Sequence, residues 1–516
     1  MSRSVRGRTV SKSATHKNSR ARVRELAFPL SILALAVFVY GLYGFDGVLL
    51  RDYSIYLYGG QRVADGVPPY AGVFDHKGPL APMIAGLGVV ISQIFGWDDV
   101  YTVRGVFFAT ACLAVAGVYL LGKNVFQSER AGLFAALAFL GFYGFAQPAS
   151  SGPEPKTPMV LFEILCLLFA TQKRWFWSGF FGSLAFLVWQ LMGFFPFVTF
   201  LLAVLRPREE RFGAALRAAA GISVPLLAIL AYYYYHGALK YLLDGMLVFN
   251  TTYLVRGSFN LGPQLAGAAY NIVLPYATML VPILIGLFVI LRLYTRRPYE
   301  YRFVPILVTL PGPILWSIRD FQLADDFYVF LPYAAIGFGA FVAARLRRAE
   351  SPRVPAALLA AILLAVAVGN TFEAINSSAA QRLTGTTVTL PAQRAWAEEI
   401  EARYGEDVKI ASIGSPQVLV LLHRENPSPY LWLTAGIDGY IEGETPGGFD
   451  GWLDDLEASN PDVLTFLADG QILFNQHLTY EHKRELMGRL NARYHTEKIG
   501  PWWVYVKNSL DEGDKA

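Results

Sequence analysis

Long apolar runs dominate the first two thirds of the chain, separated by short basic or glycine- and proline-containing segments. Most are close to the roughly 20 residues that a helix needs to cross about 30 Å of hydrocarbon. They are too long for barrel strands, so a helix is the structure that can satisfy their backbone hydrogen bonds within lipid. We therefore predict about eleven transmembrane helices plus interfacial helices. The spans lie near 26–45, 101–121, 131–147, 158–172, 175–191, 192–205, 215–235, 263–291, 303–318, 326–344 and 354–370.

Basic residues between the spans set the expected orientation, because arginine and lysine concentrate in cytoplasmic loops. Pairs of spans separate three arginine clusters: Arg206/Arg208/Arg211/Arg217, Arg292/Arg296/Arg297/Arg302 and Arg345/Arg347/Arg348/Arg353. With these clusters cytoplasmic, the loops 236–262 and 319–325 face outward, as does everything beyond about residue 371. The apolar stretch 79–97 keeps this parity as a re-entrant or interfacial helix, whereas a crossing there requires 175–205 to be one long span.

Hydrophobic patterning changes after Asn370, which divides the chain into three expected parts. Residues 1–24 form a basic cytoplasmic N-terminus, 25–370 a transmembrane domain and 371–516 an exported soluble α/β domain. In the last part the pattern predicts a helix over 398–404 and a strand over 407–412, and Asn460-Pro461-Asp462 opens a short apolar run. A charged helix near 480–493 and a strand over 501–506 complete the expectation.

Composition and charge agree with a multi-pass protein of the cytoplasmic membrane. Charged residues make up 16% of the chain, below the roughly 25% of soluble proteins. The first 24 residues carry basic side chains and no acid, but they abut a membrane helix, so the positive-inside effect explains them better than a nucleic-acid-binding arm. Cys112 and Cys166 fall inside apolar runs, so we expect no disulfide in the exported domain.

The segment 46–80, directly after the first span, gathers acids, basic residues and tyrosines at the predicted outer surface. It begins Asp46-Gly-Val-Leu-Leu-Arg51-Asp52-Tyr53-Ser-Ile-Tyr56-Leu-Tyr58-Gly59-Gly60-Gln61-Arg62. It continues with Asp65-Gly66-Val67-Pro68-Pro69-Tyr70 and Phe74-Asp75-His76-Lys77-Gly78-Pro79-Leu80.

In this order, the elements resemble those of the GT-C superfamily of glycosyltransferases. They are an Asp after the first helix, an aromatic-rich amphipathic helix, a Gly-x-Pro-Tyr turn, and a Lys-(Pro/Gly)-Pro-Leu element that opens the next helix. The branch that they resemble uses polyprenyl-phosphate sugars, and it includes the protein O-mannosyltransferases and the transferase that adds aminoarabinose to lipid A. The resemblance covers residues 26 to about 345, and loosely the exported domain. It implies a GT-C-like fold and transfer with inversion at the anomeric carbon.

Three later segments are also similar to this family. Ser151-Gly152-Pro153-Glu154-Pro155 resembles its acidic outer loop, and Leu187-Val188-Trp189-Gln190 its paired-helix segment. Arg319-Asp320-Phe321-Gln322, followed by the segment 326–332, resembles an outer loop before an aromatic-Leu-Pro helix start. Two departures stand out. Lys77-Gly78-Pro79-Leu80 replaces the frequent Lys-Pro-Pro-Leu, and Asp52-Tyr53 replaces Asp-Glu, which removes one acid and puts a fixed metal site in doubt.

The chemistry of such a donor assigns roles to these residues. Displacing a polyprenyl phosphate at the anomeric carbon needs a base for the acceptor hydroxyl, and a carboxylate suits that role. Cations must stabilise the charge on the departing phosphate. Asp52 is the candidate base, and Glu154 positions the acceptor or shares a divalent cation with Asp52. The candidate substrate-binding residues are Lys77, Arg319, Arg62, Tyr56, Asp75 and Tyr328.

Each candidate also has an ordinary structural interpretation. Asp52 is a favoured type of helix cap, and Lys77 at a helix end is placed to snorkel to lipid headgroups. Glu154 between prolines fits a solvated loop acid, and Arg319 beside Asp320 fits an exposed ion pair of little energetic value. Asp75 fits a solvated or structural acid. Gln190 is expected to bond to a neighbouring backbone group.

Three function classes compete. The leading hypothesis is a membrane glycosyltransferase whose partners are a polyprenyl-phosphate sugar, membrane lipid, and a glycan, lipid or protein acceptor. The alternative is a polytopic lipid or glycan transporter or flippase, which usually has charged residues along a path within its spans. Arg104 and Glu163 are the main candidates for such a path, and the other charges gather at one face. A membrane-anchored receptor active only through 371–516 would not need so many spans.

Overall fold

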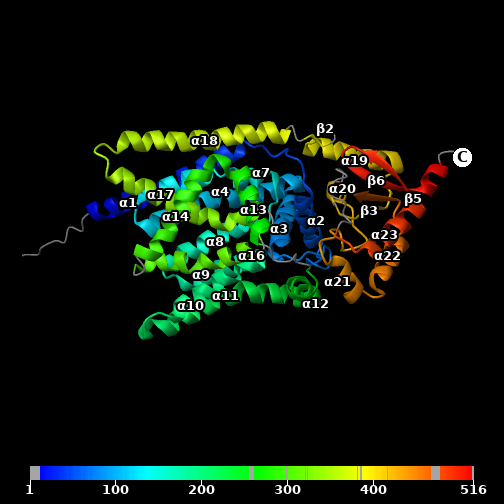
Figure 1. Ribbon diagram of the computed structural model, residues 1–516, viewed down its shortest axis with the longest axis horizontal. Coiled ribbons are helices and arrows are strands. Elements are labelled where there is room, and N and C mark those ends of the chain that lie inside the picture. The colour runs from blue at the N-terminus through cyan, green and yellow to red at the C-terminus, as the bar shows by residue number, and fades with distance from the viewer. Residues whose placement is uncertain are drawn as a thin grey trace, which may run out of the picture.

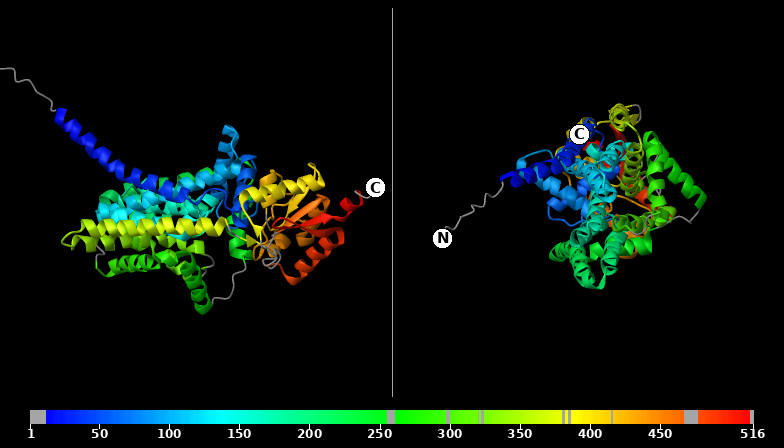
Figure 2. Two further views of the ribbon diagram at one scale, coloured as in Figure 1. Left: turned by 90° about the horizontal axis from the view of Figure 1, so that it is seen from above. Right: turned by 90° about the vertical axis from the view of Figure 1, so that its left-hand side faces the viewer.

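The computed structural model describes residues 12–254, 261–296, 300–319, 321, 324–379, 382–383, 386–414, 416–466 and 477–513. A long bundle of helices occupies one end of the molecule and a small sheet with its helices the other (Figure 1). Two helices, α2 (Arg51–Ala64) and α3 (Leu80–Phe95), lie between them. Helix α1 (Lys12–Gly41) begins at the end of the bundle that lies away from the sheet (Figure 2).

Helices cover every predicted apolar span. In order they are α4 (Asp99–Phe126), α5 (Glu129–Leu140), α6 (Tyr143–Ala146), α7 (Pro148–Ser151), α8 (Lys156–Thr171), α9 (Trp175–Val188), η1 (Gln190–Gly193), α10 (Phe194–Val204) and α11 (Arg208–Tyr235). There follow α12 (Leu239–Leu243), the π-helix η2 (Asp244–Tyr253), α13 (Leu261–Tyr276), η3 (Ala277–Met279), α14 (Leu280–Arg296), η4 (Tyr301–Phe303), α15 (Val304–Thr309), α16 (Pro311–Arg319), η5 (Ala324–Phe330), α17 (Leu331–Arg347) and α18 (Arg353–Ala379).

The apolar helices differ in whether they are long enough to cross a membrane. Within the described ranges, 6 helices are long and apolar enough to cross a membrane, or 7 when the pair Glu129–Leu140 and Tyr143–Ser151, bent by 70°, counts as one. The shorter apolar helices are Leu26–Gly41, Leu80–Phe95, Trp175–Val188 and Gln190–Val204. The stretch 79–97, which we predicted to be a re-entrant or interfacial helix, forms the short helix α3. This helix ends at Phe95, has Gly96 as its C-cap and packs mainly against α2.

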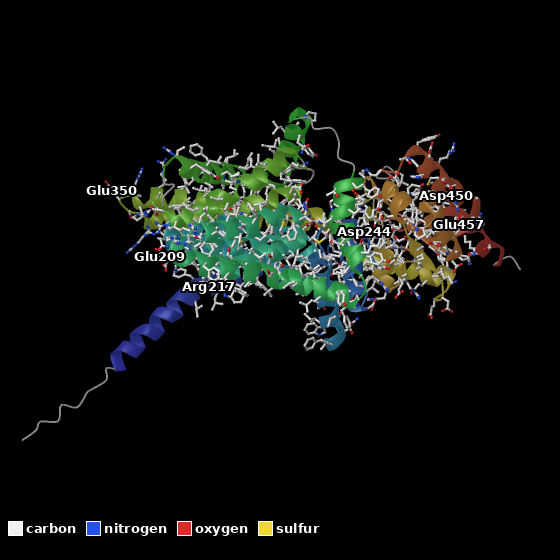
Figure 3. The ribbon with its side chains drawn as sticks, turned by 90° about the horizontal axis from the view of Figure 1, so that it is seen from below. Glu209, Arg217, Asp244, Glu350, Asp450 and Glu457 are labelled. Atoms are coloured by element: carbon white, nitrogen blue, oxygen red, sulfur yellow. The ribbon has the colours of Figure 1, made fainter. Side chains whose placement is uncertain are left out.

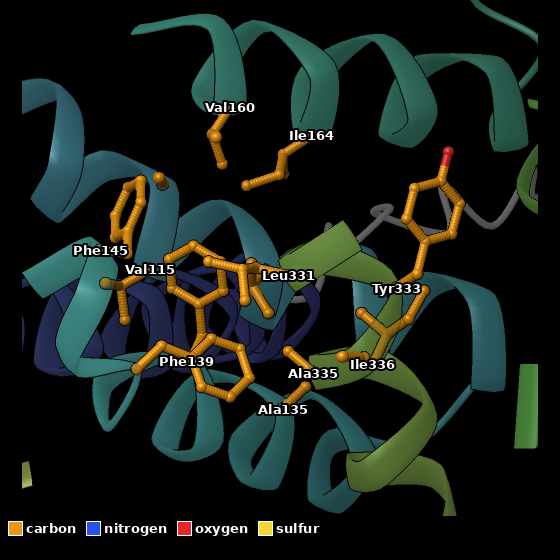
Figure 4. Packing of buried hydrophobic residues seen from close by; sticks show 14 of the residues in the cluster. Val115, Ala135, Phe139, Phe145, Val160, Ile164, Leu331, Tyr333, Ala335 and Ile336 are labelled. Carbon is orange, nitrogen blue, oxygen red and sulfur yellow. The ribbon is translucent and has the colours of Figure 1, made fainter. Parts of the chain in front are cut away.

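Small residues let the central helices approach closely, as is usual between membrane helices. A Cβ at Gly339 of α17 would lie 2.2 Å from the carbonyl oxygen of Ala131 in α5. At this crossing Ala335 and Leu331 pack against Ala135 and Phe139 (Figure 4). A larger residue at Gly339 would push α5 and α17 apart.

Residues beside two of the predicted basic loops lie at the same end of the molecule. Arg217 and Glu209 beside one loop, and Glu350 beside another, lie opposite Asp450 and Glu457 of the C-terminal part (Figure 3).

A small mixed sheet organises the C-terminal part. Its strands are β3 (Ile410–Ser412), β4 (Val463–Phe466), β5 (Tyr494–Ile499) and β6 (Trp502–Lys507), in the order β3-β4-β6-β5. Strands β3 and β4 are parallel and the other pairs antiparallel. Before it, β1 (Arg382–Leu383) pairs with β2 (Thr386–Thr387). The helices are α19 (Leu390–Tyr404), α20 (Gln417–Leu422), α21 (Ile437–Glu444), α22 (Gly448–Ala458), α23 (Tyr480–Arg493) and α24 (Asn508–Gly513).

The segment 46–80 joins the bundle to this C-terminal part. Leu49 exchanges two hydrogen bonds with the side chain of Gln393 in α19: its N–H donates at 2.7 Å and its carbonyl accepts at 3.1 Å. The Phe74 N–H donates to the Pro429 carbonyl at 2.9 Å, and α20 packs on α2. The segment that carries the candidate chemistry is thus held from both sides.

Candidate active site

Helix α2 carries the predicted base in its first turn, where the helix dipole favours a carboxylate. The helix follows Leu50, which is extended and forms no side-chain cap bond. The interpretation of Asp52 as the helix cap is therefore wrong. Asp52 accepts a hydrogen bond from Arg51 Nε at 3.0 Å, and its side chain remains 41% exposed. Part of the carboxylate is thus open to a substrate.

The loop before α3 holds Lys77 through its backbone. The Tyr70 hydroxyl donates to the Lys77 carbonyl at 2.5 Å. The carbonyl of His76 accepts from Gln190 Nε2 at 2.9 Å and from Asn250 Nδ2 at 2.8 Å. The expectation that Gln190 bonds to a backbone group is confirmed. Its partner is the peptide unit that precedes Lys77.

Gly78 explains one departure from the family pattern. Its N–H donates to the Val188 carbonyl at 3.2 Å, a bond that a proline cannot form. A Cβ at this position would lie 2.0 Å from the Leu187 carbonyl oxygen. The loop therefore lies directly against the end of α9, and glycine is the residue that fits.

The Lys77 ammonium group is not committed to an acid. It lies 5.7 Å from the centre of the Tyr56 ring. Among the described residues, no carboxylate oxygen lies within the 4.0 Å of an ion pair to it. The interpretation that Lys77 snorkels outward is not favoured, because it lowers the pKa of the buried Glu154 carboxyl, which requires proximity. Lys77 is thus a free cation beside an acid-lined site.

Tyr56 links the two halves of the site. Its hydroxyl donates to Asp75 Oδ2 at 2.9 Å. Burial raises the pKa of Tyr56 well above its ordinary value, and the nearby carboxyl groups of Asp75, Asp52 and Glu154 raise it further. Asp75 is itself buried and also accepts from the His76 N–H at 2.7 Å, so of its two ordinary interpretations the structural one holds.

A buried ion triad lies next to Glu154. Lys156 Nζ is 2.6 Å from Asp325 Oδ2 and 2.5 Å from Asp326 Oδ1, and only 4% of the Lys156 side chain is exposed. The ammonium also lies 4.5 Å from the centre of the Trp189 ring. These groups come from α8, η5 and the end of α9, so the triad ties three parts of the bundle together.

Glu154 is buried, not solvated as its ordinary interpretation expected. It is 8% exposed, and its Oε1 accepts a hydrogen bond from the Lys156 N–H at 3.2 Å. Burial, with a smaller contribution from the Asp325 carboxylate, raises the pKa of Glu154 to about 8, against the lowering effect of Lys156 and Lys77. At neutral pH this carboxyl is therefore mostly protonated.

Arg62 lies elsewhere. It stands at the far end of α2, ten residues and about 15 Å along the helix from Asp52. Its guanidinium pairs with Glu425 and, at 3.3 Å, with Asp65. Arg62 lines a cavity of about 590 Å³, together with residues that include Trp97. The structure does not bring Arg62 together with Asp52 and Lys77.

The last two candidate substrate-binding residues are Tyr328 and Arg319. Tyr328 is 2% exposed, and its hydroxyl donates to the Gly144 carbonyl at 2.6 Å, so it supports the bend after α5 and has no open face. Arg319 is the last residue of α16, but its side chain and Asp320 lie outside the described residues.

The residues present do not fit a shared divalent cation. In the described part of the chain, no group of three or more His, Cys, Asp or Glu side chains is arranged to hold a metal. Arg51 occupies one Asp52 oxygen, and the Lys156 ammonium lies between the two aspartates beside Glu154.

The two candidates for a transport path are buried in the packing. The Arg104 guanidinium donates to the carbonyls of Gly152 at 3.2 Å, Gly47 at 2.9 Å and Phe45, so it fastens the outer loops. Glu163 is fully buried in α8. Neither side chain is open to a path.

Sequence reasoning missed Lys156, Asp325 and Asp326. The signal was present, since a lysine and two adjacent aspartates open helices that are otherwise apolar or aromatic. Their separation of 170 residues hides the fact that they meet.

No family model and no curated protein matches this sequence. Solved structures do match. ArnT from Cupriavidus metallidurans in the apo state is similar with a TM-score of 0.61 at 12% identity, over 94% of this chain and 99% of that one. ArnT bound to undecaprenyl phosphate is similar with a TM-score of 0.61 at 13% identity, over the same shares. The chain has a GT-C fold.

A weaker likeness, with a TM-score of 0.49 at 14% identity, is to the apo oligosaccharyltransferase of Archaeoglobus fulgidus, over 85% of this chain and 69% of that one. The predicted fold class is confirmed at the level of a polytopic, mostly helical GT-C fold with a small C-terminal sheet.

Proposed function

We propose that this GT-C protein is a membrane glycosyltransferase. It transfers a sugar from a polyprenyl-phosphate donor to an acceptor on the outer side of the cytoplasmic membrane. In this proposal the N-terminus is cytoplasmic and 371–516 is an exported domain. The proposal is supported by the partly exposed carboxylate of Asp52 in the first turn of α2 and by the Lys77 ammonium, which lies 5.7 Å from the centre of the Tyr56 ring on the same helix and has no acidic partner among the described residues. The fold of ArnT, which has been solved with undecaprenyl phosphate, supports it.

The proposed reaction is a single displacement. The acceptor oxygen attacks the anomeric carbon while Asp52 takes the hydroxyl proton. The bond from the anomeric carbon to the phosphate oxygen breaks, and its electron pair leaves with the polyprenyl phosphate. Lys77 stabilises the charge that develops on this phosphate. One displacement from the opposite face inverts the anomeric centre.

Donor binding is the first test. The purified full chain in lipid nanodiscs is titrated with undecaprenyl phosphate, and binding is followed by native mass spectrometry and by thermal shift. Saturable binding is expected in the wild type and in the control Lys240→Gln, which removes an exposed lysine that pairs with Asp244 and Glu444. Absence of binding in the wild type overturns the proposal.

Transfer is the second test. Glycan and lipid profiling of a strain that lacks the protein identifies the missing sugar. Synthetic undecaprenyl-phosphate carriers of that sugar, labelled with tritium, are then offered to the purified chain with envelope fractions of the deletion strain. Label in an acceptor is expected. Unchanged profiles in the deletion strain contradict the proposal.

A further inference from the structure

The ammonium group of Lys156 neutralises acidic side chains of the candidate site. Its ammonium lies between two carboxylates, 2.6 Å from Asp325 and 2.5 Å from Asp326, and it is almost fully buried. The face of the Trp189 ring closes a further side at 4.5 Å. The Glu154 carboxyl bonds to the backbone N–H of the same residue. Lys156 is therefore the centre around which three acidic side chains are arranged.

A divalent cation in this place would need the same carboxylate oxygens. Mg²⁺ and Mn²⁺ prefer carboxylate, carbonyl and water ligands. Here two carboxylates each give an oxygen to the ammonium, and a metal would have to displace a buried cation of the same sign. The ammonium thus occupies the position in which a metal would be useful.

We propose that Lys156 is the resident cation of this site and takes the place of a divalent metal, so that donor binding and sugar transfer need no metal. The inference rests on the proposed function for its reaction and deepens it by naming the source of positive charge.

The two lysines then have separate tasks. Lys77 has no acidic partner among the described residues and is free to meet the phosphate. Lys156 is saturated by Asp325 and Asp326, so it acts as a positioning residue that keeps their charge from repelling the donor. With Glu154 protonated, the three acids and two lysines carry no net formal charge. Without Lys156, one negative charge would remain.

The first experiment uses the wild-type chain in nanodiscs. Undecaprenyl phosphate affinity is measured after EDTA treatment and again with added Mg²⁺ or Mn²⁺. The affinity is expected to stay within about twofold in all three conditions, because the lysine already supplies the charge. A loss of about tenfold with EDTA that Mg²⁺ restores overturns the inference.

Metal binding is measured separately by calorimetric titration with MgCl2 and MnCl2 and by elemental analysis of the purified chain. No stoichiometric metal is expected, and one tightly bound ion per chain overturns the inference. This measurement needs no donor. If undecaprenyl phosphate does not bind to the wild type, only the proposed function fails, and the titration still decides the cation.

Three variants test the role of Lys156. Lys156→Gln is expected to lose at least about tenfold in undecaprenyl phosphate affinity, because the aspartates are left uncompensated. Lys156→Arg keeps the charge and should remain within about threefold. The double variant Lys156→Gln/Asp326→Asn restores the net charge of the triad and should recover both thermal stability and most of the affinity without metal.

The control is Lys240→Gln, which removes a lysine that also pairs with two acids, Asp244 and Glu444, but lies on the surface. It should change nothing. Wild-type affinity in Lys156→Gln contradicts the inference, and so does a folded double variant that stays as weak as the single one.

Discussion

The two ends of α2 present the same kinds of residue in opposite states. Near the start, the Asp52 carboxylate is partly exposed, and Lys77, whose ammonium lies over the ring of Tyr56, has no acidic partner among the described residues. At the other end, Arg62 is bound to Glu425 and Asp65. A charged residue of α2 is thus a good candidate for substrate binding or catalysis only when its neighbours leave its charged group free to contact a substrate.

The largest expected effect is at the open end of α2. Asp52→Asn keeps the size of the side chain and removes its basicity, so kcat for sugar transfer should fall at least about 100-fold. Donor affinity and thermal stability should change little, because Asp52 contacts Arg51 and not the buried core. Initial rates with labelled donor measure the effect. If Asp52→Asn has the same kcat as the wild type, Asp52 is not the base, and the two ends of α2 do not differ in function.

Lys77→Gln comes next. Loss of a charge-assisted contact to phosphate should weaken undecaprenyl phosphate binding about 10- to 100-fold. Lys77→Arg, which keeps the charge, should lose less, and Lys240→Gln should lose nothing. Affinity is measured by titration in nanodiscs. Equal affinity in the wild type and Lys77→Gln would show that Lys77 is as uninvolved as Arg62.

Glu154 gives the site a pH dependence of predictable sign. Because burial raises the pKa of Glu154 to about 8, the carboxyl is neutral below that pH and adds a negative charge above it. Undecaprenyl phosphate affinity should therefore fall by about three- to tenfold as the pH rises from 7 to 9.

Glu154→Gln is the control, because it cannot ionise and should lack this fall. The folded state holds a proton that the unfolded state releases between the ordinary pKa of 4.5 and about 8. Wild-type stability should accordingly decrease relative to Glu154→Gln as the pH rises through that window. Parallel pH curves for the two proteins would contradict the assignment.

The smallest effect is expected at the C-terminal end of α2, where Arg62 already pairs with Glu425 and Asp65. Arg62→Gln breaks ion pairs whose acid Glu425 is well exposed, so stability should fall by no more than about 1 kcal/mol. Transfer and donor affinity should stay within about twofold. A large loss in either would place Arg62 in the site and reverse the comparison.

Pattern and composition predict much of this fold. The apolar runs mark the helices of the bundle, and the forecast helix near 480–493 and strand over 501–506 match α23 and β6. Strand β5 was missed because it is an edge strand whose inner positions, from His495 to Lys498, are all polar, so no apolar alternation marks it.

The site is easiest to predict where it is local. Asp52, Tyr56 and Lys77 lie within one segment, and the structure places the Lys77 ammonium 5.7 Å from the centre of the Tyr56 ring; the role of each residue stays a prediction. Lys156, Asp325 and Asp326 stand out in the sequence as charges at the starts of apolar helices, but their contact could not be predicted, because it depends on the packing of α8 against η5. Nor does spacing along α2 show that Arg62 already has partners on the C-terminal part.

The bidentate exchange between Leu49 and Gln393 makes the two parts of the protein structurally inseparable near the site. Leu49 is buried, and Gln393 satisfies both of its peptide groups only two residues before α2 starts. A chain truncated after α18 would leave this peptide without partners, and the start of α2 would lose its anchor. Helix α19 of the C-terminal part thus fixes the position at which α2 begins.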